Sequence, residues 1–120
     1  MTIRGYVDDF YQAIVTVTVR GSRTAVTLDM ALDTAFSGDI CLPIPIATQL
    51  GLELITTQNY ELADGSVEEE LVFLGHVIFG EEKPATVVLT DSEAALLGTG
   101  LLTDANLHID FIAKTVEIEI

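Results

Sequence analysis

Cysteine is nearly absent from this 120-residue sequence, since Cys41 is its only one. A single thiol rules out an intrachain disulfide, and a lone free cysteine is typical of proteins in a reducing compartment. The first residues lack the apolar core of a secretion signal, and no apolar run is long enough to span a bilayer. We therefore expect a cytoplasmic protein that is not inserted in a membrane.

Basic residues are also scarce. Five Lys and Arg stand against nineteen Asp and Glu, which gives a formal net charge of -14. Such a chain repels phosphate backbones and anionic lipids, so neither nucleic acid nor a membrane surface is an expected partner. The acidity does not indicate disorder, because hydrophobic residues make up 49% of the chain and can form a core.

Helix signals are sparse, and the dominant hydrophobic period is two residues, which is typical of β-strands. Residues 25–33 show it best, because their even-numbered positions are apolar and their odd-numbered positions are polar or alanine. The pattern predicts one all-β domain over residues 1–120, a closed or partly closed barrel with one or two short helices. The expected strands are 11–20, 25–33, 71–79, 85–89 and the residues from 116 onward, with a loop over 80–84 and short helices over 45–50 and 101–105.

Two glycines mark expected turns. Gly51 follows the first short helix and is expected to end it in a left-handed conformation. Asp64 and Gly65 form a dipeptide that is typical of a tight turn between two strands. A hairpin is therefore expected around residues 64 and 65.

The stretch ALDTAFSGDICLP, residues 31–43, places Asp33 at the end of an apolar strand and before a turn of small residues. The simplest interpretation is an aspartate that caps its own turn through backbone N–H groups. The stretch also resembles the active-site loop of the retropepsin-like (retroviral-type) aspartic proteases, especially their bacterial members. The resemblance lies in the apolar lead-in, in Asp33 and Thr34, and in the ending Leu42-Pro43.

Further segments resemble the same family in the same order. LADGS, residues 62–66, is similar to the tip of its flap hairpin, and AALLGTGLL, residues 94–102, is similar to its second apolar-apolar-Gly motif. The final HIDFIAKTVEIEI resembles its closing strands, so the resemblance covers roughly residues 11–120. It implies a retropepsin-like barrel with a mobile, substrate-binding flap. The implied flap residues are Ala63, Asp64, Gly65 and Ser66.

The resemblance implies an aspartic endopeptidase, a hydrolase of peptide bonds. Its chemistry uses two carboxylates that share one proton, so that one activates a water and the other protonates the carbonyl oxygen. The second motif here has no aspartate, so the resemblance implies a homodimer in which Asp33 of each subunit meets on the axis. Thr34 would bond across that axis and support the loop, and the partner would be a peptide or protein substrate. No metal and no cofactor is implied.

Ala35 departs from the family pattern, in which this position is most often glycine. Glycine tolerates unusual backbone angles, so the methyl group of Ala35 fits if the local φ is negative, but it could also push the two loops apart and disturb the shared proton. Two alternatives therefore stay open beside the enzyme. One is a non-catalytic dimeric domain that binds peptides or proteins, and the other is a dimerisation module without a ligand.

The remaining candidate residues have plainer interpretations. His76 and His108 are interpreted as partly buried sheet residues, in preference to metal ligands. Cys41 lies between two apolar residues and is expected to be a small buried hydrophobe, in preference to a nucleophile. Three consecutive glutamates, residues 68–70, suit a solvated strand edge that discourages aggregation, and they could also bias a cleft toward basic peptides.

Overall fold

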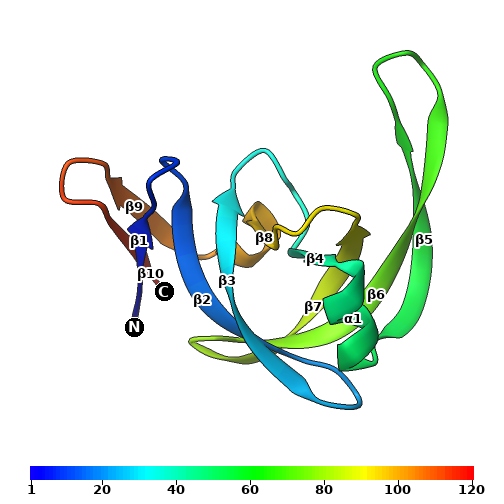
Figure 1. The fold of residues 1–120 in the computed structure, drawn as a ribbon, viewed down its shortest axis with the longest axis horizontal. Coiled ribbons are helices and arrows are strands. Elements are labelled where there is room, and N and C mark those ends of the chain that lie inside the picture. Colours follow the sequence, from blue (N-terminus) through cyan, green and yellow to red (C-terminus); the bar gives the residue numbers. More distant parts are fainter.

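The computed structural model describes residues 1–120 and contains ten strands, one α-helix and one short 3₁₀ helix (Figure 1). In chain order they are β1 (Thr2–Val7), β2 (Ala13–Arg20), β3 (Ala25–Asp33), β4 (Ile40–Pro43), α1 (Ile44–Leu50), β5 (Glu53–Glu61), β6 (Val67–Phe79), β7 (Glu81–Thr90), β8 (Leu96–Gly98), η1 (Thr99–Leu102), β9 (Asn106–Asp110) and β10 (Thr115–Glu119).

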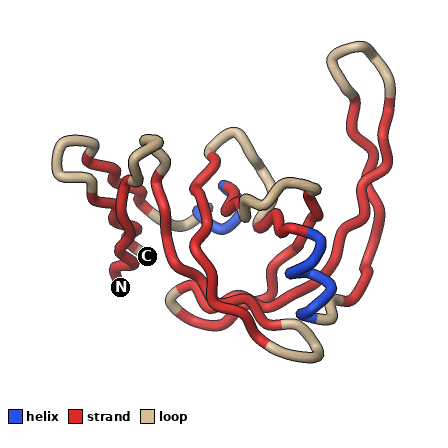
Figure 2. The backbone as a smooth tube through the Cα atoms, viewed as in Figure 1, coloured by secondary structure: helices blue, strands red, loops and turns tan.

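Six of the strands close into a ring, which Figure 2 shows as the central loop of red tube. They pair in the order β2, β3, β8, β4, β7 and β6, and β6 pairs again with β2 to complete the circuit. Strands β1, β10 and β9 extend the sheet outward from β2, and β5 extends it from β6. The expected all-β, closed barrel is confirmed. Closure removes most of the free strand edges that an open sheet would expose.

The core fills this ring with aliphatic side chains. Val15, Val19, Met30, Leu42 and Leu97 come from four different strands, and each has no exposed surface. Strand β3 shows the predicted alternation, since its even-numbered side chains pack on the core while Thr27 and Asp29 are exposed. The alternation aims the odd-numbered side chains of β3 away from the core.

Helix α1 matches its prediction closely. It begins one residue earlier than expected, at Ile44, and carries a proline in its first turn. Gly51 ends it with φ of 71°, a left-handed conformation that glycine adopts without strain. Neither this helix nor the shorter η1 has the length and apolar character needed to cross a membrane.

The structure departs from the expected elements at several places. The second short helix spans Thr99–Leu102, not 101–105, because the N–H groups of Thr99 and Gly100 bond to an adjacent loop and start the turn there. The loop expected over 80–84 is reduced to Gly80, since residues 81–84 continue β7 and pair with β6. Strand β1 was not expected at all, and it forms by pairing with the C-terminal β10.

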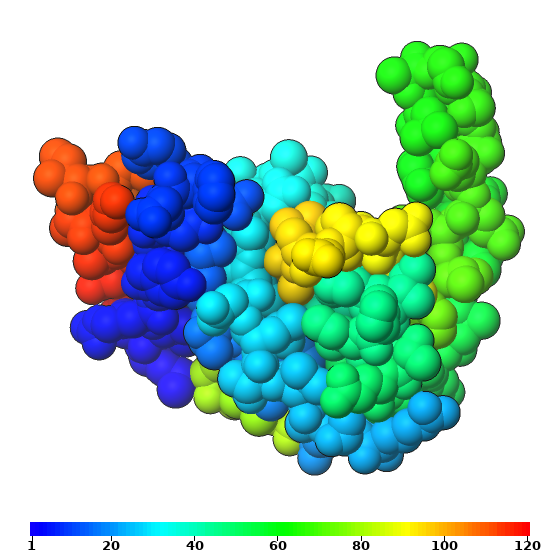
Figure 3. All heavy atoms as spheres, viewed as in Figure 1, coloured from blue at the N-terminus to red at the C-terminus, as the bar shows by residue number.

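Strand β5 and the outer part of β6 form a two-stranded arm that stands clear of the barrel, as Figures 1 and 3 show. All nine residues of β5 are exposed. The arm ends in the expected tight turn, where Gly65 has φ of 86°. A hairpin with so little packing is a low-stability part of a fold and can move relative to the barrel.

Candidate active site

Asp33 is the last residue of β3, and it pairs in parallel with Gly98 of β8. Its Oδ1 accepts a hydrogen bond of 3.0 Å from the backbone N–H of Ala35, and its carbonyl accepts one of 3.1 Å from Phe36. Asp33 therefore does cap its own turn, as the simplest interpretation holds. Its Oδ2 has no protein partner and is left for solvent or a ligand.

Ala35 occupies this turn without backbone strain. The only non-glycine residues with positive φ are Tyr11 and Lys114, so Ala35 does not need the conformational freedom of glycine. Its side chain is exposed, as is that of Thr34 beside it. The φ of Ala35 is therefore not positive, so its methyl group fits in the turn within one subunit.

The loop after Asp33 rests on the β8–η1 segment. The N–H groups of Gly98, Thr99 and Gly100 donate to the carbonyls of Asp39, Phe36 and Gly38, at 2.8, 2.9 and 3.0 Å. A Cβ added to Gly98 would overlap the carbonyl oxygen of Gly38 and lie 2.7 Å from that of Phe36. The second apolar-apolar-Gly motif therefore serves as the backbone support of the Asp33 loop, and its glycine permits the close approach.

Asp39 is a second carboxylate of this loop that the sequence analysis did not single out. Its Oδ2 accepts hydrogen bonds from the backbone N–H of Thr86 at 2.9 Å and from the Thr86 hydroxyl at 3.1 Å. The two residues are 47 positions apart, so no local pattern reveals the pairing. Asp39 thereby ties the Asp33 loop to β7.

We expect Asp39→Ala to lower the free energy of unfolding by about 1–3 kcal/mol, because it leaves the partly buried N–H of Thr86 without an acceptor. Urea unfolding followed by circular dichroism measures this. Asp91→Ala is the matched control, since Asp91 is exposed and lies in a turn after β7. Equal stability of the two variants would show that Asp39 does not anchor the loop.

A groove of about 360 Å³ opens beside Asp33, and most of its lining is apolar. Asp33 is the only acidic residue in it, so one subunit supplies one carboxylate. Neither Asp64 nor any other residue of the arm tip lines the groove. The residues that line it include Tyr11, Gln12, Asp33, Thr34 and Phe111.

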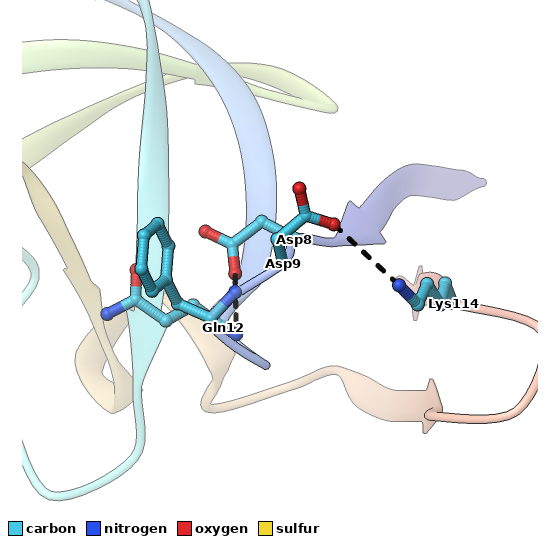
Figure 4. Close-up of polar contacts among 5 residues, drawn as sticks. Asp8, Asp9, Gln12 and Lys114 are labelled. Atoms are coloured by element: carbon cyan, nitrogen blue, oxygen red, sulfur yellow. Dashed lines mark hydrogen bonds and ion pairs between the residues drawn. The ribbon is translucent and has the colours of Figure 1, made fainter.

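Two neighbouring turns form one wall of this groove. In the β1–β2 turn, the Asp8 carboxylate accepts hydrogen bonds of 2.9 Å from the N–H groups of Phe10 and Gln12. Lys114 of the β9–β10 turn lies 3.8 Å from the Asp9 carboxylate, and Figure 4 shows the two turns side by side. These contacts fix the turns while leaving large apolar side chains on them exposed. The exposed fractions are 84% for Phe10, 73% for Tyr11, 55% for Phe111 and 97% for Ile112.

The predicted flap residues Ala63, Asp64, Gly65 and Ser66 lie at the tip of the arm and are exposed. The Asp64 carboxylate accepts hydrogen bonds from the hydroxyl and the N–H of Ser66, at 2.6 and 2.9 Å. These bonds lower the pKa of Asp64 below its ordinary value of 3.8. The tip is therefore a well-formed turn, and the structure holds it away from the Asp33 groove.

The glutamate run lies on the arm. Glu68 and Glu70 accept hydrogen bonds from Tyr60 and Gln58 across the hairpin, at 3.1 and 2.9 Å. Their stretch of β6 pairs only with β5, so it is a solvated strand edge, as the plainer interpretation holds. The carboxylate of Glu68 raises the pKa of the Tyr60 hydroxyl through its hydrogen bond and its charge.

The remaining candidates lie away from the groove. Cys41 is buried as expected, and burial together with the charge of Glu70 raises the pKa of its thiol, which keeps it protonated. His76 is partly buried as expected, but His108 is exposed because it lies on the outer strand β9. No three His, Cys, Asp or Glu side chains gather in a way that could hold a metal ion.

Comparison with known proteins identifies the fold. Neither protein-family models nor curated proteins gave a match. Among solved structures, the chain resembles a retropepsin-like aspartic protease from Rickettsia conorii, with a TM-score of 0.74 and 22% identity over 98% of this chain and 89% of that one. It also resembles the EIAV protease in complex with an inhibitor, with a TM-score of 0.56 and 16% identity over 78% and 86%. The chain therefore has the fold of the retropepsin-like aspartic proteases, as the resemblance of its Asp33 loop predicts.

Proposed function

We propose that this protein is an aspartic endopeptidase that hydrolyses peptide bonds as a homodimer, with Asp33 of each subunit as the catalytic residue. The observation that carries the proposal is the position of Asp33. In a retropepsin-like barrel it ends β3 at a groove, keeps one carboxylate oxygen free, and is the only acid there. Residues 1–120 act as one such unit, in a reducing compartment such as the cytoplasm that suits the lone thiol of Cys41.

The mechanism needs both copies of Asp33. Two carboxylates held close together share one proton, because both cannot be ionised at short distance. The ionised one removes a proton from a water whose oxygen attacks the peptide carbonyl carbon, and the protonated one donates to the carbonyl oxygen. The tetrahedral intermediate then breaks its C–N bond, and the leaving amine takes a proton from the carboxyl pair. A single subunit cannot supply both roles.

The surface around the groove supports a second copy as the partner. Phe10, Tyr11, Phe111 and Ile112 leave large apolar side chains exposed on the two turns that wall it. Large apolar side chains exposed together on neighbouring turns are typical of an interface, and a two-fold interface covers the same patch on both subunits. Thr34 is exposed beside Asp33, where its hydroxyl would bond to the partner's loop across the axis.

The arm would cover the substrate. Its tip, residues 63–66, would move toward the groove and close over an extended peptide, which binds as an added strand with its side chains in alternating pockets. The sparse packing of β5 permits such a movement.

The direct test is cleavage of a peptide library at acid pH, with and without a pepstatin-type inhibitor. We expect cleavage that the inhibitor blocks, because such inhibitors bind the shared-proton geometry of two carboxylates. Binding of peptides without cleavage at any pH would instead support the non-catalytic peptide-binding domain. A protein that neither cuts nor binds peptides would fit the dimerisation module.

We expect dimerisation and cleavage to strengthen as the pH falls below about 6, in line with ordinary carboxylate pKa values. Two chains of charge -14 carry -28 together, and protonating carboxylates reduces their repulsion and supplies the shared proton. Sedimentation velocity and peptide cleavage between about pH 4 and pH 8 measure both effects. A strong, active dimer at pH 8 with neither property at pH 5 would contradict the proposal.

The turn at the flap tip is expected to persist into the acid range. The folded-state pKa of Asp64 is lowered, so the stability gained from its Ser66 bonds is fully present above the ordinary value of 3.8. That stability is lost only as the pH falls through the lower, folded-state pKa. The tip therefore stays formed while most other carboxylates begin to protonate.

A further inference from the structure

The structure contains a larger hollow, of about 670 Å³, at the end of β3 opposite Asp33. It lies where the β2–β3 turn meets the residues that follow α1. Arg20, Arg23 and His76 line it, and Leu52 and Leu74 add apolar surface. We call the space lined by these five residues the basic hollow. Two of the five Lys and Arg residues and one of the two His residues of a strongly acidic chain thus gather at one place.

Arg23 is the arginine of this chain that has no carboxylate partner. Arg4 pairs with Glu117 and Arg20 pairs with Glu82, both on the protein surface. Nineteen acidic residues are present, yet none of them lies within ion-pair distance of this guanidinium. Its charge is available to a ligand, whereas Glu82 already balances that of Arg20.

The side chain of Arg23 is held in place by its surroundings. Its Nη1 donates a hydrogen bond of 3.2 Å to the carbonyl oxygen of Thr48 near the C-terminus of α1. Its Cγ lies 2.7 Å from where a Cβ on Gly51 would be, so glycine lets the stem lie against the backbone. Holding a long side chain in one position reduces the entropy lost when it binds a ligand.

A second, smaller hollow of about 220 Å³ lies on the other side of Arg23. The two hollows share Arg23, Gly51 and Leu52, and the smaller one adds the apolar side chains of Phe73 and Leu89. Arg23 therefore lines two adjoining hollows, a larger one whose lining is mostly polar and a smaller one whose lining is mostly apolar.

We propose that the basic hollow binds an extended peptide segment that carries one carboxylate flanked by apolar side chains. The planar guanidinium of Arg23 presents two parallel N–H donors of the kind that match a carboxylate, and His76 offers a further donor. The flanking apolar side chains would lie against Leu52 and Leu74 in the larger hollow and against Phe73 and Leu89 in the smaller one. One free guanidinium suits a single carboxylate better than a phosphate, which usually engages several cations.

Glu53 limits how much negative charge the bound peptide segment can carry. It lines the same hollow and would repel a second negative charge close to the first. The ligand is therefore a segment with an isolated acidic group, and a run of acidic residues is disfavoured. The site is independent of Asp33, so on a protease it would tether a substrate or regulator away from the cleavage site.

The probe is the peptide acetyl-Ala-Leu-Glu-Leu-Ala-amide, titrated into the full chain at neutral pH while backbone amide NMR shifts are recorded. We expect saturable shifts at Gly21, Thr24 and Gly51, and binding at least about fivefold weaker when Gln replaces Glu in the peptide. A peptide with three consecutive Glu should bind no more tightly than the single-Glu peptide. A Leu-rich peptide with a free C-terminal carboxylate tells whether a chain terminus can replace the side chain.

Arg23→Gln should weaken binding at least about fivefold, Arg23→Lys should give an intermediate value, and the matched control Arg4→Gln should bind like wild type. Arg23 is exposed, so these variants are expected to fold, which circular dichroism checks. The proposal is overturned if no saturable shift occurs at millimolar peptide, if the shifts gather around Asp33 instead, or if Arg23→Gln binds as well as Arg4→Gln. All of these readouts measure binding and remain valid if the protein cleaves nothing.

Discussion

Asp33→Asn is expected to lower kcat/KM for peptide cleavage by at least about a thousandfold, because it removes the ionisable group from both subunits at once. An amide cannot accept a proton from water or share one with its mate. The fold should survive the change, since the Asn oxygen can still accept the hydrogen bond that the N–H of Ala35 now donates to Asp33. The melting temperature and the dimer should therefore stay close to those of the wild type.

Asp29→Asn is the matched control for this experiment. It makes the same change on the same strand, at an exposed carboxylate that bonds to Tyr6 and Thr16 and does not line the groove. Peptide cleavage, sedimentation velocity and thermal melts should be measured for both variants. Retained cleavage in Asp33→Asn, or an equal loss in Asp29→Asn, would remove Asp33 from the catalytic role.

Gly98→Ala is expected to lower the free energy of unfolding by about 3 kcal/mol or more, at the upper end of overpacking costs. The new methyl group would meet the carbonyl oxygens of Gly38 and Phe36 and the ring of Phe36. Backbone atoms cannot turn aside as a flexible side chain can, so the Asp33 loop must shift. Any cleavage activity should fall with it, because the reacting carboxylates must be held to within a fraction of an ångström.

Gly65→Ala separates this steric effect from the conformational preference of glycine. Gly65 has φ of 86°, but a Cβ there would meet nothing within 4 Å. Its cost should be about 1 kcal/mol, that of placing alanine in a left-handed conformation. Urea unfolding measures both variants. If Gly98→Ala were no less stable than Gly65→Ala, the close contact between β8 and the Asp33 loop would not be a constraint.

The parts of this fold that sequence reasoning identified are those set by short-range chemistry. The two-residue period of β3 places Asp33 at a strand end, Gly51 ends α1, and Asp64 with Gly65 turns the arm. In each case the residues that carry the signal are the residues that form the structure. Whether the methyl group of Ala35 fits depends on the backbone φ at that residue, which the sequence alone does not give.

The parts that it did not identify depend on partners far along the chain. A closed or partly closed barrel was expected, but the pairing that closes it was not: β2 pairs with β6, for example Thr18 beside Ile78, and nothing in either strand specifies the other. Strand β1 is interrupted by Gly5 and has Val7 as its only buried residue, so its pattern is weak without the pairing to β10. Residues 81–84 were expected to form a loop because three charged residues and a proline are also a typical turn composition, and only their pairing with β6 shows that they continue β7.

The dependence of the Asp33 loop on residues 98–100 has a consequence for biosynthesis. Phe36 and Thr99, which hold the loop and its support together, are 63 positions apart. A nascent chain that has emerged only through the arm carries Asp33 but lacks the backbone donors that shape its surroundings. Contacts of such long sequence separation form late in folding. The surroundings of Asp33 therefore take shape only after residues 98–100 have been synthesised and have folded against the loop.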